Sequence, residues 1–208
     1  MTALKDFQPP LVAILRGLEP AQAAEVGQVL FDAGFRILEV PLNRRGALQC
    51  IVNLTAIAPA DALIGGGTML SRADVDTVRA AGGRLMVSPN CNPSVISHAV
   101  ALGMLAAPGI ATATEAFAAL EAGAHALKLF PAETLGVGGM KALRSVLPAN
   151  TPLWPVGGVT PSSIAPWRRA GATGFGIGTQ LFQPGMGLEA LGVAAREFRA
   201  AWGESKAA

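Results

Sequence analysis

Helix-like, alanine-rich segments alternate along the chain with short apolar runs. The helix-like segments end in a small residue followed by glycine, at Gly34, Gly82, Gly103, Gly123 and Gly171. Successive glycines of this set lie about 20 to 24 residues apart, or about twice that distance, which is the length of one short strand plus one helix. The pattern therefore predicts a repeated strand–helix unit.

Eight apolar runs occupy the strand positions of this repeat, and amphipathic segments such as 21–33 and 113–122 lie between them. The predicted strands cover residues 11–17, 37–43, 63–69, 84–90, 105–111, 126–132, 153–159 and 174–181. Eight such units predict an α/β fold, a (β/α)8 TIM barrel with short loops. No linker or charge run divides the chain, so residues 1–208 are predicted to form a single domain. A doubly wound open sheet is the alternative, but the sequence lacks its usual Gly-x-Gly-x-x-Gly turn.

Composition and charge narrow the class of protein. Hydrophobic residues make up 51% of the chain and charged residues 14%, which is too apolar for a disordered protein. Every apolar stretch is interrupted before the roughly 18 to 20 residues that a membrane helix needs, and the first ten residues show no signal-peptide pattern. We therefore predict a cytoplasmic protein with no membrane partner.

The distribution of the basic residues argues against a nucleic-acid-binding protein, and the cysteine spacing argues against a zinc or redox site. The net charge is +2, and the basic residues are scattered rather than interleaved with aromatic ones, so nucleic acid is not a predicted partner. Cys50 and Cys91 match no zinc or redox spacing and are interpreted as free buried thiols.

Two charged residues interrupt predicted strands that are otherwise apolar. Glu39 lies within Ile-Leu-Glu-Val-Pro, and Lys128 lies within Leu-Lys-Leu-Phe. A lysine in an apolar pocket loses part of its preference for the charged form, and the free amine can then attack a ketone to form a Schiff base. A nearby carboxylate can move the protons that this chemistry requires. The alternative is that the two residues form a structural pair.

A metal-dependent reaction has little support in the sequence. The chain contains two histidines, His98 and His125, both in predicted helical or loop stretches, where a lone histidine is more often an ordinary residue than a metal ligand. We therefore predict no metal and no cofactor.

Glycine-rich segments follow the seventh and eighth predicted strands. Gly157 and Gly158 follow Val156, and Gly178 precedes Thr179. Barrel enzymes frequently bind phosphate at these two places, because glycine lets backbone N–H groups approach the oxygens. The alternative is that the glycines only relieve crowding at the rim of the barrel.

Two residues at other strand ends are open to either interpretation. Arg16 could hold a carboxylate through two hydrogen bonds, or could simply face solvent. Thr68 follows three glycines and could contact a ligand or be an ordinary strand residue.

Seven ordered motifs, spread over nearly the whole chain, resemble one known family. They are residues 14–17, 38–43, 64–68, 87–90, 111–116, 127–132 and 156–159. The sequence is similar to the class I 2-keto-3-deoxy-6-phosphogluconate and 6-phosphogalactonate aldolases.

The resemblance implies a role for each matching residue. Lys128 would be the Schiff-base lysine and Glu39 the general acid/base, and Pro89 would shape the pocket near Glu39. Arg16 and Thr68 would contact the keto-acid end of the substrate. The phosphate would be held by Gly157, Gly158, Gly178 and Thr179. Members commonly form trimers, so the resemblance also implies a homotrimer.

Within the family the sequence looks closer to the phosphogalactonate branch. Asn43 stands where the phosphogluconate branch typically has arginine, and Val156 stands where that branch has threonine. A hydroxyl or guanidinium beside the substrate C4 hydroxyl would select one epimer, and its replacement should relax or reverse the choice.

The expected reaction is reversible cleavage of 2-dehydro-3-deoxy-6-phosphogalactonate to pyruvate and glyceraldehyde 3-phosphate. The alternatives are the gluconate epimer, acceptance of both epimers, and 4-hydroxy-2-oxoglutarate as substrate. More remote are a phosphosugar isomerase or epimerase on the same barrel, and a phosphosugar-binding protein without catalysis.

Overall fold

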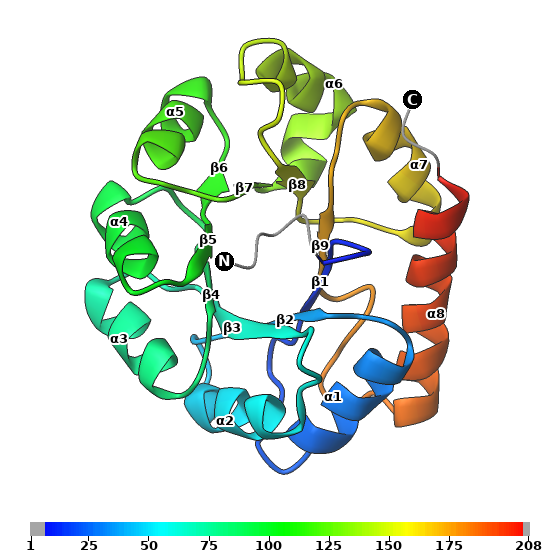
Figure 1. Ribbon diagram of the computed structural model, residues 1–208. Coiled ribbons are helices and arrows are strands. Elements are labelled where there is room, and N and C mark those ends of the chain that lie inside the picture. Colours follow the sequence, from blue (N-terminus) through cyan, green and yellow to red (C-terminus); the bar gives the residue numbers. More distant parts are fainter. Residues whose placement is uncertain (1–6, 206–208) are drawn as a thin grey trace.

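Strands and helices alternate along the chain in the computed structural model, which describes residues 7–205 (Figure 1). The strands are β1 (Leu11–Ile14), β2 (Ile37–Pro41), β3 (Leu63–Gly67), β4 (Leu85–Val87), β5 (Leu105–Ala107), β6 (Gly109–Ile110), β7 (Leu127–Leu129), β8 (Leu153–Pro155) and β9 (Phe175–Ile177). The helices are α1 (Ala23–Asp32), α2 (Ala47–Ile57), α3 (Arg72–Ala80), α4 (Pro93–Ala101), α5 (Ala113–Glu121), α6 (Ala132–Arg144), α7 (Pro161–Arg169) and α8 (Leu188–Glu204).

The strands form two parallel sheets that curl around a common interior, and we call this arrangement the strand ring (Figure 1). One sheet has six strands in the order β5-β4-β3-β2-β1-β9, and the other has three in the order β6-β7-β8. Residues 105–110 pass from the first sheet to the second. On the other side, a single bridge between Val156 and Gly176 links β8 to β9.

Each of the eight predicted strand positions contains a strand, with two differences from the prediction. The observed strands are two to five residues long, because the outer parts of the predicted runs form loops. The fifth position holds two strands, β5 and β6, with Pro108 between them. Proline has no N–H to donate to a sheet ladder, so it interrupts the strand.

Helix ends follow local sequence signals. Ser71 and Thr112 begin α3 and α5 with capping boxes, in which Asp74 and Glu115 complete the hydrogen bonds. The five glycines of the sequence repeat, at positions 34, 82, 103, 123 and 171, all have positive φ values, as expected for residues that end a helix. The repeat therefore marks true helix ends.

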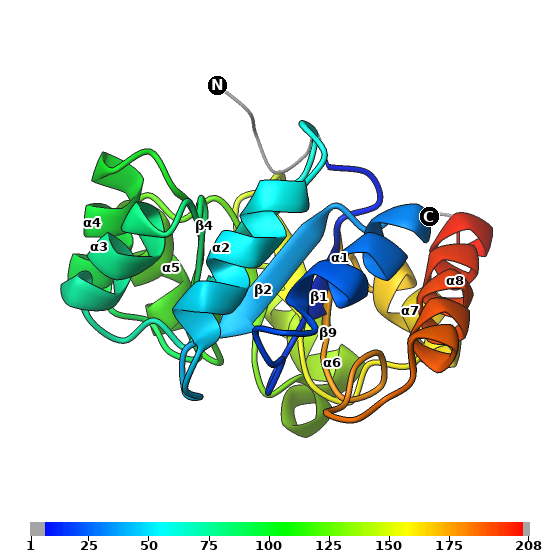
Figure 2. The same ribbon diagram turned by 90° about the horizontal axis from the view of Figure 1, so that it is seen from below.

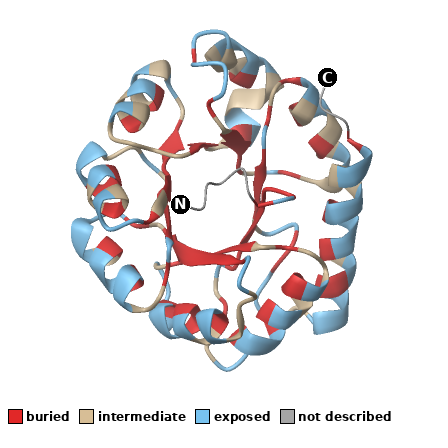
Figure 3. Cartoon of the chain, viewed as in Figure 1, coloured by how far each residue is buried: buried red, intermediate tan, exposed pale blue. Residues whose placement is uncertain are grey.

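Two apolar clusters stabilise the fold. The larger cluster fills the layer between the strand ring and the surrounding helices, and the smaller one fills part of the ring interior. Figure 3 shows the buried residues along the strands and on parts of the helices. Helix α8 packs against both α1 and α7 on the outside of β1 and β9 (Figure 1 and Figure 2). Charged side chains inside such a ring are costly unless they are paired or used.

The remaining sequence expectations have mixed outcomes. Cys50 and Cys91 are free thiols as predicted; Cys50 is buried, whereas Cys91 is only half-buried, which corrects that part of the interpretation. Within residues 7–205, no helix is both long and apolar enough to cross a membrane.

Candidate active site

The inner cluster shows which strand positions face the ring interior. Strand residues alternate between the two faces of a sheet, and the inward set includes Ile37 on β2 and, just before β7, Ala126. Glu39 and Lys128 each lie two residues further along the same strands. Both side chains therefore point into the strand ring.

Lys128 is buried at the centre of β7. Its side chain is 7% exposed, and its Nζ lies 5.0 Å from the centre of the Phe130 ring. The neighbouring strands place Gly109 and Trp154 in register with it. Gly109 leaves space on one side, whereas Trp154 and Phe130 provide apolar walls that exclude water.

Glu39 is buried on β2 and packs against glycine. Its side chain is 3% exposed, and any side chain at Gly67 would overlap its Oε1 atom. Burial raises the pKa of Glu39, while the positive charges of Lys128 and Arg16 act in the opposite direction. A buried carboxyl group with a raised pKa holds a proton more readily than an exposed one, which suits a general acid/base.

Two further predicted residues lie just beyond the carboxyl ends of the strands. Arg16 follows β1 by two residues and is exposed, yet its charge acts on Glu39. Thr68 directly follows β3 and has φ of 55°, and it is the one non-glycine residue with positive φ among residues 7–205. Such strained backbone conformations concentrate at functional sites.

Pro89 lies on the Lys128 side of the strand ring. A side chain at Gly109 would overlap the backbone of Pro89, and Gly109 is the register partner of Lys128. The structure therefore brings Pro89 close to β7, and its predicted place near Glu39 stays a prediction.

The predicted phosphate residues gather where β8 and β9 meet. The bridge from Val156 to Gly176 holds the ends of these strands together, so the loop with Gly157 and Gly158 lies beside the loop with Gly178 and Thr179. Gly157 and Gly158 have φ values of 111° and 64°, which residues with a side chain rarely adopt.

A carboxylate that the sequence analysis missed lies over the first of these loops. Glu133, in the first turn of α6, is placed so that any side chain at Gly157 would overlap its Oε2 atom. Its Cβ also lies 3.4 Å from the side-chain position of Gly158. Glu133 is visible in the sequence, in the run Phe-Pro-Ala-Glu that follows shortly after Lys128. Only the fold shows that its side chain reaches the loop after β8.

The two histidines have ordinary partners. Nε2 of His98, on α4, lies 2.6 Å from Oδ1 of Asp76, and Nδ1 of His125 accepts a hydrogen bond from the Ala106 backbone at 3.1 Å. No group of three or more histidine, cysteine, aspartate or glutamate side chains is placed to hold a metal ion in the described part of the chain.

Comparison with known proteins assigns the family. The model of the aldolase family "KDPG and KHG aldolase" matches residues 4–190. The chain belongs to this family. Its members are aldolases, a class of carbon–carbon lyases, and this chain is therefore an aldolase.

Individual relatives align with most of the length of this aldolase. The 2-dehydro-3-deoxy-6-phosphogalactonate aldolase of Escherichia coli (strain K12) is 46% identical over 197 residues, which is 94% of this chain and 96% of the relative. The 2-dehydro-3-deoxy-phosphogluconate aldolase of Treponema pallidum (strain Nichols) is 34% identical over 69% of this chain and 68% of the relative. A solved structure described as "Native KDPGal structure" superimposes with a TM-score of 0.93 at 43% identity, covering 95% of this chain and 96% of that one.

Proposed function

We propose that this aldolase reversibly cleaves 2-dehydro-3-deoxy-6-phosphogalactonate into pyruvate and glyceraldehyde 3-phosphate. The observation that carries the proposal is the placement of one buried lysine and one buried carboxyl group inside the same strand ring. A class I aldolase needs an amine that can attack a ketone and a group that can move protons beside it.

The proposed chemistry follows from these two groups. The free amine of Lys128 attacks the C2 ketone, and loss of water from the carbinolamine gives an iminium ion. Glu39 accepts the proton of the C4 hydroxyl, the C3–C4 bond breaks, and its electron pair moves into the iminium to form an enamine. Glyceraldehyde 3-phosphate leaves; the enamine is protonated at C3, and hydrolysis releases pyruvate and the free lysine.

The rim residues supply binding in this proposal. Arg16 lies at the mouth of the strand ring, where its planar guanidinium can hold the substrate carboxylate, and Thr68 and Pro89 border the same end. Gly157, Gly158, Gly178 and Thr179 would hold the phosphate through backbone N–H groups. The name and higher identity of the Escherichia coli relative, together with Val156 and Asn43, favour the galactonate epimer.

The test combines trapping with a comparison of epimers. The full-length protein is treated with pyruvate and borohydride, and the modified peptide is identified by mass spectrometry. We expect a reduced pyruvate adduct on Lys128 and kcat/KM about tenfold or more higher for the galactonate epimer than for the gluconate epimer. Turnover without an adduct would favour the isomerase alternative, and equal turnover of both epimers would remove the epimer assignment.

Glu133 leads to a separate prediction about the phosphate. A carboxylate over the phosphate loop repels a phosphate dianion by about 2 kcal/mol at 4 Å in water-like surroundings, about 1 kcal/mol for each negative charge. We therefore expect Glu133→Gln to lower KM for the phosphorylated substrate by about thirtyfold with little change in kcat. Steady-state kinetics check this, with Glu121→Gln on the exposed end of α5 as control. A higher KM in Glu133→Gln would mean instead that Glu133 supports substrate binding.

The closed barrel, the single domain and the oligomeric state are also proposals. We infer that the strand ring is one closed (β/α)8 barrel and one domain, supported by the Val156–Gly176 bridge and by residues 105–110, which connect the two sheets. A homotrimer is supported by exposed large apolar side chains such as Leu48, Val52 and Leu70. A cytoplasmic location stays a prediction.

A further inference from the structure

A cavity of about 340 Å³ lies at the amino ends of the strands. Its walls include Leu63 and Leu105, the first residues of β3 and β5, and Arg84 and His125, which precede β4 and β7. The strands are parallel, so their amino ends share one face of the strand ring. Thr68 and Gly157 follow carboxyl ends and therefore lie at the opposite face, so this cavity is separate from the candidate active site.

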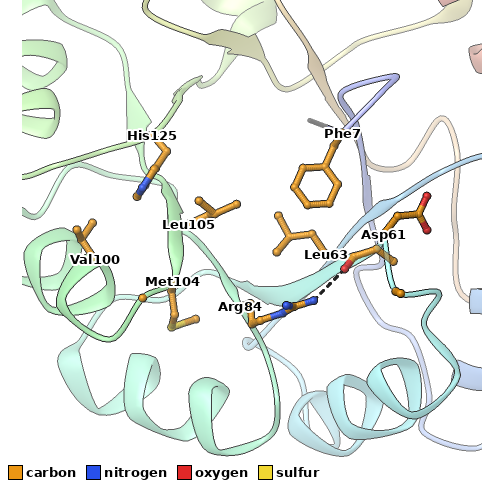
Figure 4. Close-up of a pocket in the computed structure, with 11 residues that line it drawn as sticks. Phe7, Asp61, Leu63, Arg84, Val100, Met104, Leu105 and His125 are labelled. Atoms are coloured by element: carbon orange, nitrogen blue, oxygen red, sulfur yellow. Dashed lines mark hydrogen bonds between the residues drawn. The ribbon is translucent and has the colours of Figure 1, made fainter. Parts of the chain in front are cut away.

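The body of the cavity is apolar. Phe7, Leu63 and Met104 are buried, at 5%, 2% and 1% exposed, and Leu105 completes this wall. Figure 4 shows Phe7, Leu63 and Leu105 around one open space. The volume is within the range of roughly 300 to 1,000 Å³ that is typical of small-molecule sites, which are mostly apolar with a few polar groups.

Arg84 supplies a cation at the edge of this space. Its Nη2 donates a hydrogen bond to the Ala62 carbonyl at 3.2 Å (dashed in Figure 4). Asp61 lines the same cavity, but its carboxylate is turned away and pairs with Arg36 at 2.9 Å. Within residues 7–205 the guanidinium of Arg84 therefore forms no ion pair, and its planar shape suits a carboxylate.

His125 adds a second donor on the lining. Its Nδ1 accepts the Ala106 N–H, so the proton of the neutral ring belongs on Nε2. Burial lowers the pKa of His125, which keeps the ring neutral at physiological pH. The lining thus offers one positive charge and one neutral donor.

We propose that this cavity is a second ligand site, which binds a small monocarboxylate with an apolar body. The carboxylate is held by Arg84, and the body packs on Phe7, Leu63, Met104 and Leu105. A phosphate dianion is matched less well, because Arg84 is the one lining cation without an ion pair among residues 7–205, and it balances a single negative charge. The proposal is independent of the aldol reaction.

The test uses 3-phenylpropionate as the probe and 3-phenylpropanamide as its uncharged match. Titration calorimetry on the full-length protein is expected to show saturable binding of the acid and at least tenfold weaker binding of the amide. Arg84→Gln should weaken binding of the acid about tenfold, the loss of one charged hydrogen-bond pair, and leave the amide unchanged. Arg79→Gln is the matched control, because Arg79 lies nearby and donates to the Leu102 carbonyl without lining the cavity.

A second variant keeps the test valid if Arg84→Gln alters folding. Leu105→Trp fills the cavity and should abolish binding of both probes, while thermal melting checks its fold. Aldol cleavage by Arg84→Gln should match the unaltered protein, so failure of this site and failure of the proposed function are distinguishable. The proposal is overturned if binding of the acid does not saturate. This includes the case in which another part of the chain fills the cavity and keeps the acid out. Equal binding of acid and amide, or binding of the acid that Arg84→Gln leaves unchanged, would also overturn it.

Discussion

Replacement of Lys128 by methionine is expected to abolish aldol cleavage while leaving a folded protein. Methionine fills nearly the same apolar space beside Phe130 and Trp154, so the strand ring keeps its packing. Without an amine, however, no iminium forms and the C3–C4 bond has no electron acceptor. We expect kcat to fall by about four to six orders of magnitude, and the borohydride adduct with pyruvate to disappear.

Two variants make this result specific. Lys128→Arg retains a positive charge beside Glu39 but cannot form the imine, so it should be equally inactive if covalent chemistry is required. Lys141→Met removes an exposed lysine on α6 and should retain full activity. Substantial cleavage by Lys128→Met would contradict the mechanism, and activity in Lys128→Arg alone would indicate a purely electrostatic role.

Glu39→Gln is expected to separate imine formation from bond cleavage. The amide preserves the shape that packs against Gly67 but cannot accept a proton. Loss of a general base typically costs about 10² to 10⁴-fold, so kcat should fall by that amount while pyruvate is still trapped on Lys128, although more slowly. Single-turnover trapping beside steady-state kinetics measures both steps. If imine trapping and bond cleavage are slowed equally, or if neither is slowed, proton transfer is assigned to another group.

The same variant gives a prediction on stability and pH. The pKa of Glu39 is raised in the folded protein by burial, against an ordinary value of 4.5, so the folded state holds this proton more tightly than the unfolded state. The contribution of Glu39 to the free energy of unfolding therefore declines as pH rises above about 4.5, until the raised pKa is passed. Glu39→Gln lacks this decline. Urea unfolding at several pH values measures the free energy of unfolding of both proteins. The value for Glu39→Gln minus the value for the unaltered protein should become more positive between pH 4 and pH 8. A difference that does not change with pH would contradict the raised pKa.

The strand pattern of the fold was readable from the sequence because every strand is covered on both sides. Continuous apolar runs and glycine helix ends gave all eight strand positions. Strand ends were less readable, because the residues beyond them are also apolar but enter loops. The break at Pro108 had a visible signal, since proline rarely occurs inside a strand.

The charged residues of the candidate site were predictable where they stand in strands that are otherwise apolar. Lys128 and Glu39 interrupt apolar strands, and the fold turns both inward. Glu133 carries no such signal, because a glutamate in the first turn of a helix is ordinary; only the packing of α6 against the loop after β8 gives it a role. The amino-end cavity joins residues from several strands, which no local pattern brings together.

The single bridge between β8 and β9 has a thermodynamic consequence for substrate binding. The other neighbouring strands of the ring are joined by two to five register pairs, whereas Val156 and Gly176 form one isolated pair. In the proposed function, a phosphate held by the loops after both strands is bound only when this seam is closed. Part of its binding free energy would then oppose breathing of the seam, and we expect amide hydrogens there to exchange more slowly in the liganded enzyme than in the free one.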